Sequence, residues 1–234
     1  TFPSTPLQAR RGETVVTGLP LRAAIADLAS RRGDAAGAAQ ARREAAERLG
    51  VNPDAPTLLV TGGSLGALHV NESMTGAADA LPEGAQVVHL TGRGKDEPVR
   101  AAVEAAGCSD RWHVIDYLTT MEDALAVADL VVCRSGAGTV AEMEALGLPC
   151  IYVPLPIGNG EQRLNAADHV AAGGAQLIDD KDFTADFVRS NVFPLLGSAR
   201  LADMTAASQS LGRAGAARAL ADVALEQVKE SGRE

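Results

Sequence analysis

Short, wholly apolar segments recur along this chain and are separated by longer amphipathic segments. Apolar residues fill each short segment without a polar residue at every second position, which is typical of strands buried on both faces. Strands that alternate with helices at this spacing form a parallel sheet with helices on both faces. The pattern predicts a doubly wound, Rossmann-like α/β domain. The expected strands are 57–61, 86–91, 112–115, 130–133, 150–153 and 175–178.

Helical spacing of the apolar positions fills the intervals between these strands. Gly50 follows an Ala-, Arg- and Glu-rich stretch and is a typical glycine at a helix C-terminus. The tail, about 185–229, is predicted to be mostly helical with a break near Pro194 and Gly197. Helices are expected at 33–49, 68–80, 97–106, 121–127 and 162–172, with two more beginning near Leu21 and at the turn 135–138.

Composition narrows the class of protein. The chain has 234 residues, of which 46% are hydrophobic and 22% charged, so it can bury a globular core. Its net charge of −9 argues against nucleic-acid binding. No apolar run approaches the roughly 20 residues that span a bilayer. Because the first residue is Thr1, we expect a fragment or a processed form.

Cysteine and histidine spacing predicts neither a disulfide framework nor a metal site. The three cysteines form no CxxC pair, and Cys133 and Cys150 lie inside apolar strands as expected core residues. A reducing, cytoplasmic compartment follows. No pair of the four histidines has metal-ligand spacing. His89 and His113 fall inside expected strands, where a structural role is favoured.

Two small-residue turns each connect an expected strand to an expected helix. The first is Gly62-Gly-Ser-Leu-Gly-Ala67 and the second is Ser135-Gly-Ala-Gly-Thr139. Such turns let backbone N–H groups at a helix N-terminus approach an anion, and Ser64 adds a hydroxyl. In an open α/β sheet, both turns lie beyond the carboxyl ends of the strands, where ligands bind. We interpret them as a site for a phosphate-bearing ligand, although a plain tight turn, or capping by Thr139, also fits each motif.

Acidic and amide side chains follow the second turn, 135–139, and the expected strand 150–153. Glu142 lies one turn into its helix and suits sugar hydroxyls, although it equally balances the helix dipole. The loop 154–160 leads to Glu161, Gln162 and Asn165, whose polar groups also suit sugar hydroxyls. Capping of the next helix by Asn159 or Glu161 is the alternative.

Five separated segments, in this order, resemble the C-terminal half of one family. It is the MurG family of peptidoglycan N-acetylglucosaminyltransferases, glycosyltransferase family 28, which has the glycosyltransferase-B fold. The resemblance covers nearly all of the chain, and the loop 156–162 with the Ala- and Arg-rich composition is similar to actinobacterial members. The segments are 14–22, 62–67 with Asn71, 117–121, 128–142 and 161–166.

The resemblance implies a domain that binds the donor UDP-N-acetylglucosamine without a metal or other cofactor. Ser64 and the turn 136–139 would hold the diphosphate, and Glu142 would take the ribose hydroxyls. The Leu118 backbone and Arg22 would frame the uracil, and Gln162 would contact the sugar with Asn165 nearby. Glu161 stands where the family commonly has Gln, and Leu65 where it commonly has Gln. The implied donor-binding residues are Arg22, Ser64, Leu118, Gly136, Ala137, Gly138, Thr139, Glu142, Glu161, Gln162 and Asn165.

The same resemblance implies that the catalytic base lies outside this chain. Residues 1–18 would be the remnant of an N-terminal domain and its linker, 19–192 the donor domain, and 193–234 a helical tail with exposed apolar surface. The absent domain would bind the lipid-linked muramyl pentapeptide acceptor, supply the base and make the peripheral contact with the cytoplasmic side of the membrane. The whole enzyme would invert the anomeric configuration, whereas this chain alone would bind donor without turnover.

Three other functions stay open from the sequence. The first is another UDP-sugar enzyme of this fold, such as a diacylglycerol glycosyltransferase or a UDP-sugar epimerase. An epimerase would need acid and base residues in the donor cleft, and no good candidate set stands out. The second is a nucleotide-sugar-binding subunit that works with a separate acceptor subunit. The third is a structural domain that no longer binds a ligand, which the Ser64, Glu142 and Gln162 set argues against.

Overall fold

A computed structural model describes residues 14–63, 67–157, 159–212 and 215–231 of the chain. Its strands are β1 (Thr57–Thr61), β2 (Gln86–Leu90), β3 (Trp112–Ile115), β4 (Leu130–Cys133), β5 (Cys150–Tyr152) and β6 (Ala175–Leu177). Its longer helices are α1 (Ala23–Arg31), α2 (Ala35–Leu49), α3 (Leu68–Thr75), α4 (Asp96–Ala105), α5 (Met121–Val127), α6 (Ala137–Leu146), α10 (Ala199–Gln209) and α11 (Ala216–Ser231). The short helical segments are α7 (Glu161–Asn165), α8 (Ala167–Ala171), α9 (Ala185–Phe187), a π-helical turn (Val188–Val192) and 3-10 turns at Ala78–Ala80, Asp180–Asp182 and Phe193–Leu195.

All six strands are parallel and form one sheet in the order β3-β2-β1-β4-β5-β6. From β1, the chain adds β2 and β3 on one side of the sheet. It then returns to the centre with β4 and adds β5 and β6 on the other side. The carboxyl ends of β1 and β4 flank the point where this order reverses, which is the topological switch point. The predicted doubly wound α/β fold is confirmed.

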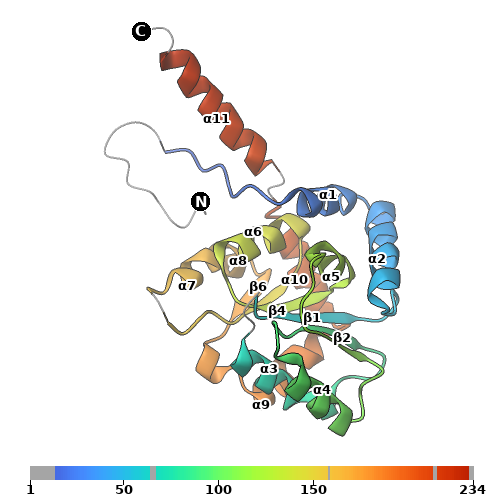
Figure 1. Cartoon of the computed structure of the whole chain (residues 1–234). Helices are drawn as coiled ribbons and strands as arrows, with labels where there is room; N and C mark the ends of the chain where they lie inside the picture. Colours follow the sequence, from blue (N-terminus) through green and yellow to red (C-terminus); the bar gives the residue numbers. More distant parts are fainter. Residues whose placement is uncertain (1–13, 64–66, 158, 213–214, 232–234) are drawn as a thin grey trace.

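Helices cover both faces of the sheet because both faces of its strands are apolar. Figure 1 shows α3, α4 and α9 on one face and α5 and α6 on the other. Within β1, Leu58 and Val60 face the first of these layers and Leu59 faces the second, as the two-residue period of a strand requires. All five residues of β1 are buried. Two apolar cores result, one on each face of the sheet.

Two predicted helices are shorter than expected. The helix expected at 68–80 ends at Thr75, where Gly76 is the C-cap residue and Thr75 Oγ1 donates to the Asn71 carbonyl. The helix expected at 162–172 divides into α7 and α8 at Ala166, which serves as the C-cap of one and the N-cap of the other. Gly50 ends α2 with a φ of 67°, the left-handed conformation predicted for it.

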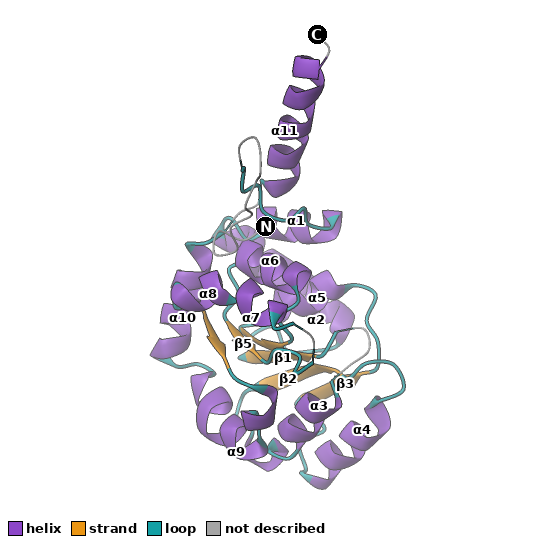
Figure 2. Cartoon of the chain, turned by 90° about the vertical axis from the view of Figure 1, so that its left-hand side faces the viewer, coloured by secondary structure: helices purple, strands orange, loops and turns teal. Residues whose placement is uncertain are grey.

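The helical tail ends in α11, which projects away from the body of the domain in both views (Figures 1 and 2). Leu220, Leu225 and Val228 are 47%, 57% and 70% exposed on it, in agreement with the expected apolar surface. Among the described residues, no helix is both long enough and apolar enough to cross a membrane.

Candidate functional site

A cavity of about 230 Å³ opens at the switch point, beyond the carboxyl ends of β1, β2 and β4. We call it the switch-point pocket. Four predicted site residues line it together, although they lie far apart in the sequence: Arg22, Leu118, Thr139 and Glu142. Gly63, with a φ of 80°, lines it from the end of β1. Ser64 lies outside the described residues, so its predicted role stays a prediction.

The first turn of α6 begins beside this pocket: Thr139 lines it, whereas the predicted site residues Gly136, Ala137 and Gly138 are not among its lining residues. Gly136 is the N-cap residue and provides no side-chain cap, so among the described residues no side chain accepts from the amides of the first turn. A Cβ built on Gly138 would meet no atom within 4 Å, so open space lies next to the backbone here. The unpaired N–H groups and the positive end of the helix dipole together favour an anion.

Arg22 and Glu142 form an ion pair across the mouth of the pocket. Arg22 Nε and Nη2 both donate to Oε1 of Glu142, at 3.1 and 2.9 Å. Glu142 is the more buried partner, with 17% of its side chain exposed against 56% for Arg22. Oε2 of Glu142 has no donor among the described residues, so it can accept hydrogen bonds from a ligand. Arg22 thus fixes the orientation of the carboxylate, a contact that the sequence did not predict.

The loop between β3 and α5 forms the opposite wall of the pocket. The Arg93 guanidinium lies over the Tyr117 ring, with Cζ 3.7 Å from the ring centroid, in a cation–π contact. Asp116 Oδ1 accepts a hydrogen bond from Gly94 N at 2.7 Å, which ties this loop to the turn after β2. The Leu118 backbone is therefore held beside the pocket by two neighbouring contacts.

The predicted sugar-contacting residues lie on α7 and do not line the switch-point pocket. Gln162 Oε1 accepts from Leu155 N at 3.0 Å, and Asn165 Nδ2 donates to the Ser135 carbonyl at 3.1 Å. Glu161 N donates to Asn159 Oδ1 at 3.2 Å, although the N-cap residue of α7 is Gly160, which provides no side-chain cap. Glu161 and Gln162 stand at the end of the loop that follows β5, and Asn165 connects this loop to the turn after β4.

Arg134 is a pocket residue that the sequence analysis missed. Its Nη1 donates to the carbonyls of Val153 and Pro154, at 2.9 and 3.1 Å, and pairs with Asp180. Both charged side chains are 15% exposed. The available signal was an arginine placed directly between an apolar strand and a glycine turn. Arg134 joins the end of β4 to the loop after β5, and so positions the α7 residues relative to α6.

Replacing Arg134 with Met is expected to lower the free energy of unfolding by about 2 kcal/mol, because Asp180 and two carbonyls lose their donor. Amide hydrogen exchange at Leu155, whose N–H is donated to Gln162 Oε1, should accelerate more than exchange in β1. Arg163→Met is the matched control, since Arg163 pairs with Asp179 on the same loop but is 51% exposed and should cost less than about 1 kcal/mol. Equal effects of the two variants would contradict the positioning role of Arg134.

A buried hydrogen-bond network connects α3 with β2 and β3, next to the pocket. Trp112 Nε1 donates to His89 Nδ1 at 3.2 Å, so the hydrogen of the neutral ring resides on Nε2. Nε2 lies 3.0 Å from Asn71 Oδ1, and Asn71 Nδ2 donates to the Thr91 carbonyl. This chain of contacts fixes α3, which follows the first glycine turn, against β2 and β3. It also confirms the predicted structural role of His89.

The described residues contain no group of three or more His, Cys, Asp or Glu side chains that could hold a metal ion. Ser135 carries a fully buried hydroxyl for which the described residues provide no hydrogen-bond partner. This hydroxyl lies in the turn before α6 and was not among the predicted site residues. The polar groups at the switch point are therefore backbone amides, hydroxyls, arginines and the two carboxylates of Asp116 and Glu142, a set suited to a phosphorylated, hydroxyl-rich ligand.

The reversed strand order places the chain in the class of doubly wound α/β domains, in which ligands bind at the switch point. A comparison with family models narrows this class. The chain belongs to the family described as the glycosyltransferase family 28 C-terminal domain, which matches residues 57–221.

Individual relatives agree with this assignment. One from Bifidobacterium longum is 46% identical over 98% of this chain and is named a UDP-N-acetylglucosamine–N-acetylmuramyl-(pentapeptide) pyrophosphoryl-undecaprenol N-acetylglucosamine transferase. The chain spans 62% of the length of that relative. The crystal structure of MurG from Acinetobacter baumannii has a TM-score of 0.65 and 27% identity, over 78% of this chain and 52% of that one. A UDP-GlcNAc 2-epimerase from Neisseria meningitidis shares the fold alone, at 15% identity and a TM-score of 0.56 over 79% and 48% of the two chains.

Proposed function

We propose that this chain is the donor-binding part of an N-acetylglucosaminyltransferase of peptidoglycan synthesis. The proposed donor is UDP-N-acetylglucosamine, and the proposed acceptor is muramyl pentapeptide linked to undecaprenyl diphosphate. The observation that carries the proposal is the position of Glu142, which lies one turn inside a helix whose uncapped N-terminus opens on the switch-point pocket. Family membership and the names of the relatives support the same donor.

Each part of the donor has a proposed partner at this edge of the sheet. The N–H groups of Ala137, Gly138 and Thr139, after the N-cap residue Gly136, would bind the diphosphate, with Ser64 beside them. Oε2 of Glu142 would accept hydrogen bonds from the ribose hydroxyls, while Arg22 holds Oε1. The proposed contacts with the uracil come from the Leu118 backbone and Arg22, and those with the sugar from Glu161, Gln162 and Asn165.

The proposed reaction is an inverting glycosyl transfer. A hydroxyl of the acceptor sugar attacks the anomeric carbon and forms the β-1,4 bond, while the bond to the diphosphate oxygen breaks and UDP leaves with its electron pair. The hydroxyl proton passes to a base that we place in the part of the enzyme beyond this chain. The first-turn amides of α6 are preorganised to stabilise the charge that develops on UDP. We place the acceptor site, and a peripheral attachment to the cytoplasmic side of the membrane, in that other part as well.

Calorimetric titration of the 234-residue chain with UDP-N-acetylglucosamine, UDP-glucose and ADP tests the donor site. We expect the uridine ligands to bind and ADP not to bind. Glu142→Ala should weaken UDP-N-acetylglucosamine by about tenfold or more, because hydrogen bonds to a carboxylate contribute about 1.5–3 kcal/mol. Glu142→Gln should weaken it less, since an amide oxygen still accepts. Glu104→Ala, which removes an exposed glutamate from α4, is the control and should bind as the unchanged chain does.

Two results would count against the proposal. If ADP binds with the same affinity as the uridine ligands, then Leu118 and Arg22 do not select for uracil, and their proposed role is wrong. Unchanged affinity in a folded Glu142→Ala chain would show that the ribose does not reach this carboxylate.

A further inference from the structure

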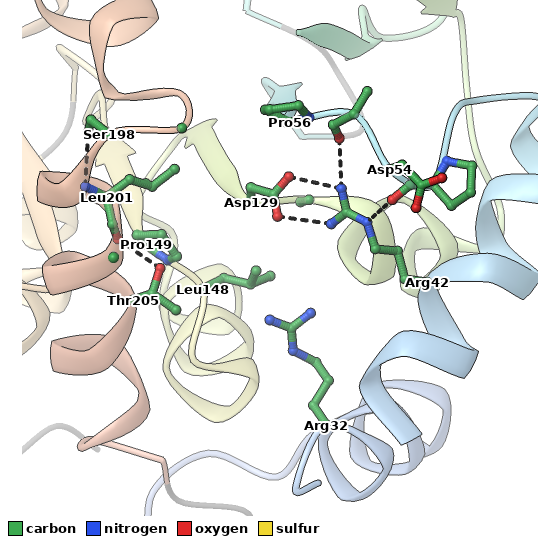
Figure 3. A pocket seen from close by; sticks show the side chains of 15 residues that line it. Arg32, Arg42, Asp54, Pro56, Asp129, Leu148, Pro149, Ser198, Leu201 and Thr205 are labelled. Atoms are coloured by element: carbon green, nitrogen blue, oxygen red, sulfur yellow. Dashed lines mark hydrogen bonds and ion pairs between the residues drawn. The ribbon is translucent and has the colours of Figure 1, made fainter. Parts of the chain in front are cut away.

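A second cavity lies at the opposite edge of the sheet, where β1, β4 and β5 begin. Its volume is about 630 Å³, which is within the range of small-molecule sites. Arg32, the C-cap residue of α1, and Arg42, from the middle of α2, lie on one side of it, and the start of α10 lies on the other, as Figure 3 shows. We call this cavity the amino-edge cleft. It shares no lining residue with the switch-point pocket, so it is independent of the proposed donor site.

One of the two arginines in the cleft is fully engaged with protein groups. Arg42 Nη1 and Nη2 each donate to one oxygen of Asp129, both at 2.9 Å, and Nε donates to the Pro53 carbonyl. Asp129 Oδ2 also accepts from Thr57 N at 2.7 Å. This pair is neutral and its hydrogen bonds are satisfied, so it forms a fixed wall with no net charge.

The other arginine, Arg32, has no such partner. Its Nε donates to the Leu146 carbonyl at 2.9 Å, but no carboxylate of the described residues lies within ion-pair distance of its guanidinium. Figure 3 shows the guanidinium pointing into the cleft, from the end of α1 toward the side where Leu148 and Asp129 lie. Desolvation lowers the pKa of Arg32, and Asp129 offsets this only in part. An uncompensated guanidinium at this depth costs free energy, which a bound anion would recover.

The rest of the lining limits the kind of anion. Leu148, Pro149 and Leu201 give the cleft an apolar wall beside Arg32. Asp54, an exposed carboxylate of the lining that does not pair with Arg42, opposes a second negative charge on the ligand. One unpaired guanidinium therefore matches one negative charge. A planar carboxylate can accept from both Nη atoms of an arginine. A compact dianion would do so at a higher cost, because Asp54 repels its second charge.

We propose that the amino-edge cleft binds a small monocarboxylate that carries an apolar group. The carboxylate pairs with the Nη atoms of Arg32, and the apolar group packs against Leu148, Pro149 and Leu201. The binding partner is a free small molecule, because the volume of the cleft, about 630 Å³, is within the range of small-molecule sites.

Ligand-observed NMR and calorimetry on the 234-residue chain test this site with phenylacetate as the probe. The controls are 2-phenylethanol, which has the same ring without the charge, and benzylphosphonate at a pH above its second pKa, where it has a second negative charge. We expect saturable binding of phenylacetate with a dissociation constant in the millimolar range or below, and at least tenfold weaker binding of both controls, since a charge-assisted pair is lost or opposed.

Three variants locate the binding. Arg32→Gln removes the guanidinium and should weaken phenylacetate by about tenfold or more. Ala202→Phe places a ring in the cleft from the exposed side of α10, leaves Arg32 in place, and should also abolish binding. If Arg32→Gln does not fold, the Ala202→Phe variant still tests whether phenylacetate binds in the cleft. Arg200→Gln removes an exposed arginine of α10 that does not line the cleft, and should bind as the unchanged chain does.

The proposal is overturned by any of three results. These are no saturable binding of phenylacetate to the folded chain, equal binding of 2-phenylethanol, or phenylacetate binding that persists in a folded Arg32→Gln or Ala202→Phe chain. Displacement of phenylacetate by UDP would also overturn it, since that would place the probe at the switch-point pocket.

Discussion

Acidification from about pH 7.5 to about pH 4.5 is expected to lower the free energy of unfolding by about 5 kcal/mol. The cause is a pair of buried histidines that stay neutral in the folded chain. A loss of this size is comparable with the whole stability of many domains, which is about 5–15 kcal/mol. The chain should therefore unfold in mild acid, before most carboxylates are protonated.

The first of these histidines is His89, whose two ring nitrogens are already occupied in the network with Trp112 and Asn71. A proton added to Nδ1 would have no acceptor, because that nitrogen faces the indole N–H. Burial lowers the pKa of His89 from 6.5 to about 3. The ring is fully buried, so water cannot solvate the charged form.

His169 on α8 is the second, and it lies between β5 and α10. Ser208 Oγ donates to the Gly174 carbonyl at 3.2 Å, so it accepts from His169 Nε2, which lies 2.8 Å away. His169 Nδ1 then accepts from the Tyr152 hydroxyl at 2.9 Å. This ring is also neutral, and burial lowers the pKa of His169 from 6.5 to about 4. The network joins the last strands of the sheet to the helical tail.

The direction of the pH effect follows from these two pKa values. In each case the folded-state pKa is below the unfolded value, so the unfolded chain binds more protons than the folded chain below about pH 6.5. The free energy of unfolding therefore decreases as the pH is lowered. Each histidine contributes a slope of about 1.4 kcal/mol per pH unit until the pH reaches its folded-state pKa. Burial also lowers the pKa of His113, with Asp110 opposing, which adds a smaller effect of the same sign.

Urea unfolding at a series of pH values measures this slope. His89→Gln and His169→Gln should each lose stability at neutral pH and remove about half of the slope, and the double variant should retain only the small part due to other groups. A double variant whose slope between about pH 6.5 and about pH 4.5 equals that of the unchanged chain would refute the assignment.

Much of the fold could be predicted because its strands are continuous apolar runs. The predicted bounds of β1, β3 and β4 match those in the structure, since each run is closed by polar or turn residues at both ends. Glycines and prolines similarly located the turns before α6 and after β5. These signals are local, and they report burial and backbone conformation within a few residues.

The contacts that organise the site could not be predicted in the same way. Arg22 and Glu142 are 120 residues apart, and Arg134 and Asp180 are 46 residues apart. The local sequence around a charged residue does not indicate which distant residue it will pair with. Arg22 was assigned to the ligand by resemblance, and only the three-dimensional structure places it on Glu142. The amino-edge cleft was missed for the same reason, because Arg32 and Leu148 come together only when α1 packs against α6.

Replacing Gly174 with Ala is expected to lower the free energy of unfolding by about 3 kcal/mol, because the new methyl group overpacks a buried network. Its Cβ would lie 2.5 Å from Ser208 Oγ and 2.6 and 2.7 Å from Cδ2 and Nε2 of His169. Both side chains are fully buried. The backbone cannot shift freely, since Gly174 N donates to the His169 carbonyl and Gly174 O accepts from Cys150 N at the start of β5.

Gly138→Ala is the matched control, because its Cβ would meet no atom within 4 Å. Ala at this helical position should be neutral or stabilising by up to about 1 kcal/mol. Thermal unfolding separates the two, with a decrease in melting temperature of about 6–12 °C expected for Gly174→Ala alone. A Gly174→Ala chain as stable as the unchanged one would mean that the ring of His169 has room to move.

The Gly174→Ala variant also connects the steric and the acid effects. If the methyl group displaces the imidazole of His169 from its buried position, water reaches the ring and its pKa returns toward 6.5. The variant should then be less stable at neutral pH and yet lose less stability on acidification, by about 1.4 kcal/mol per pH unit. Adding Ser208→Ala should restore only a small part of the stability, since the contacts with the imidazole remain. A full pH slope in the destabilised variant would instead show that His169 stays buried and that the strain is taken up by the backbone between α8 and β6.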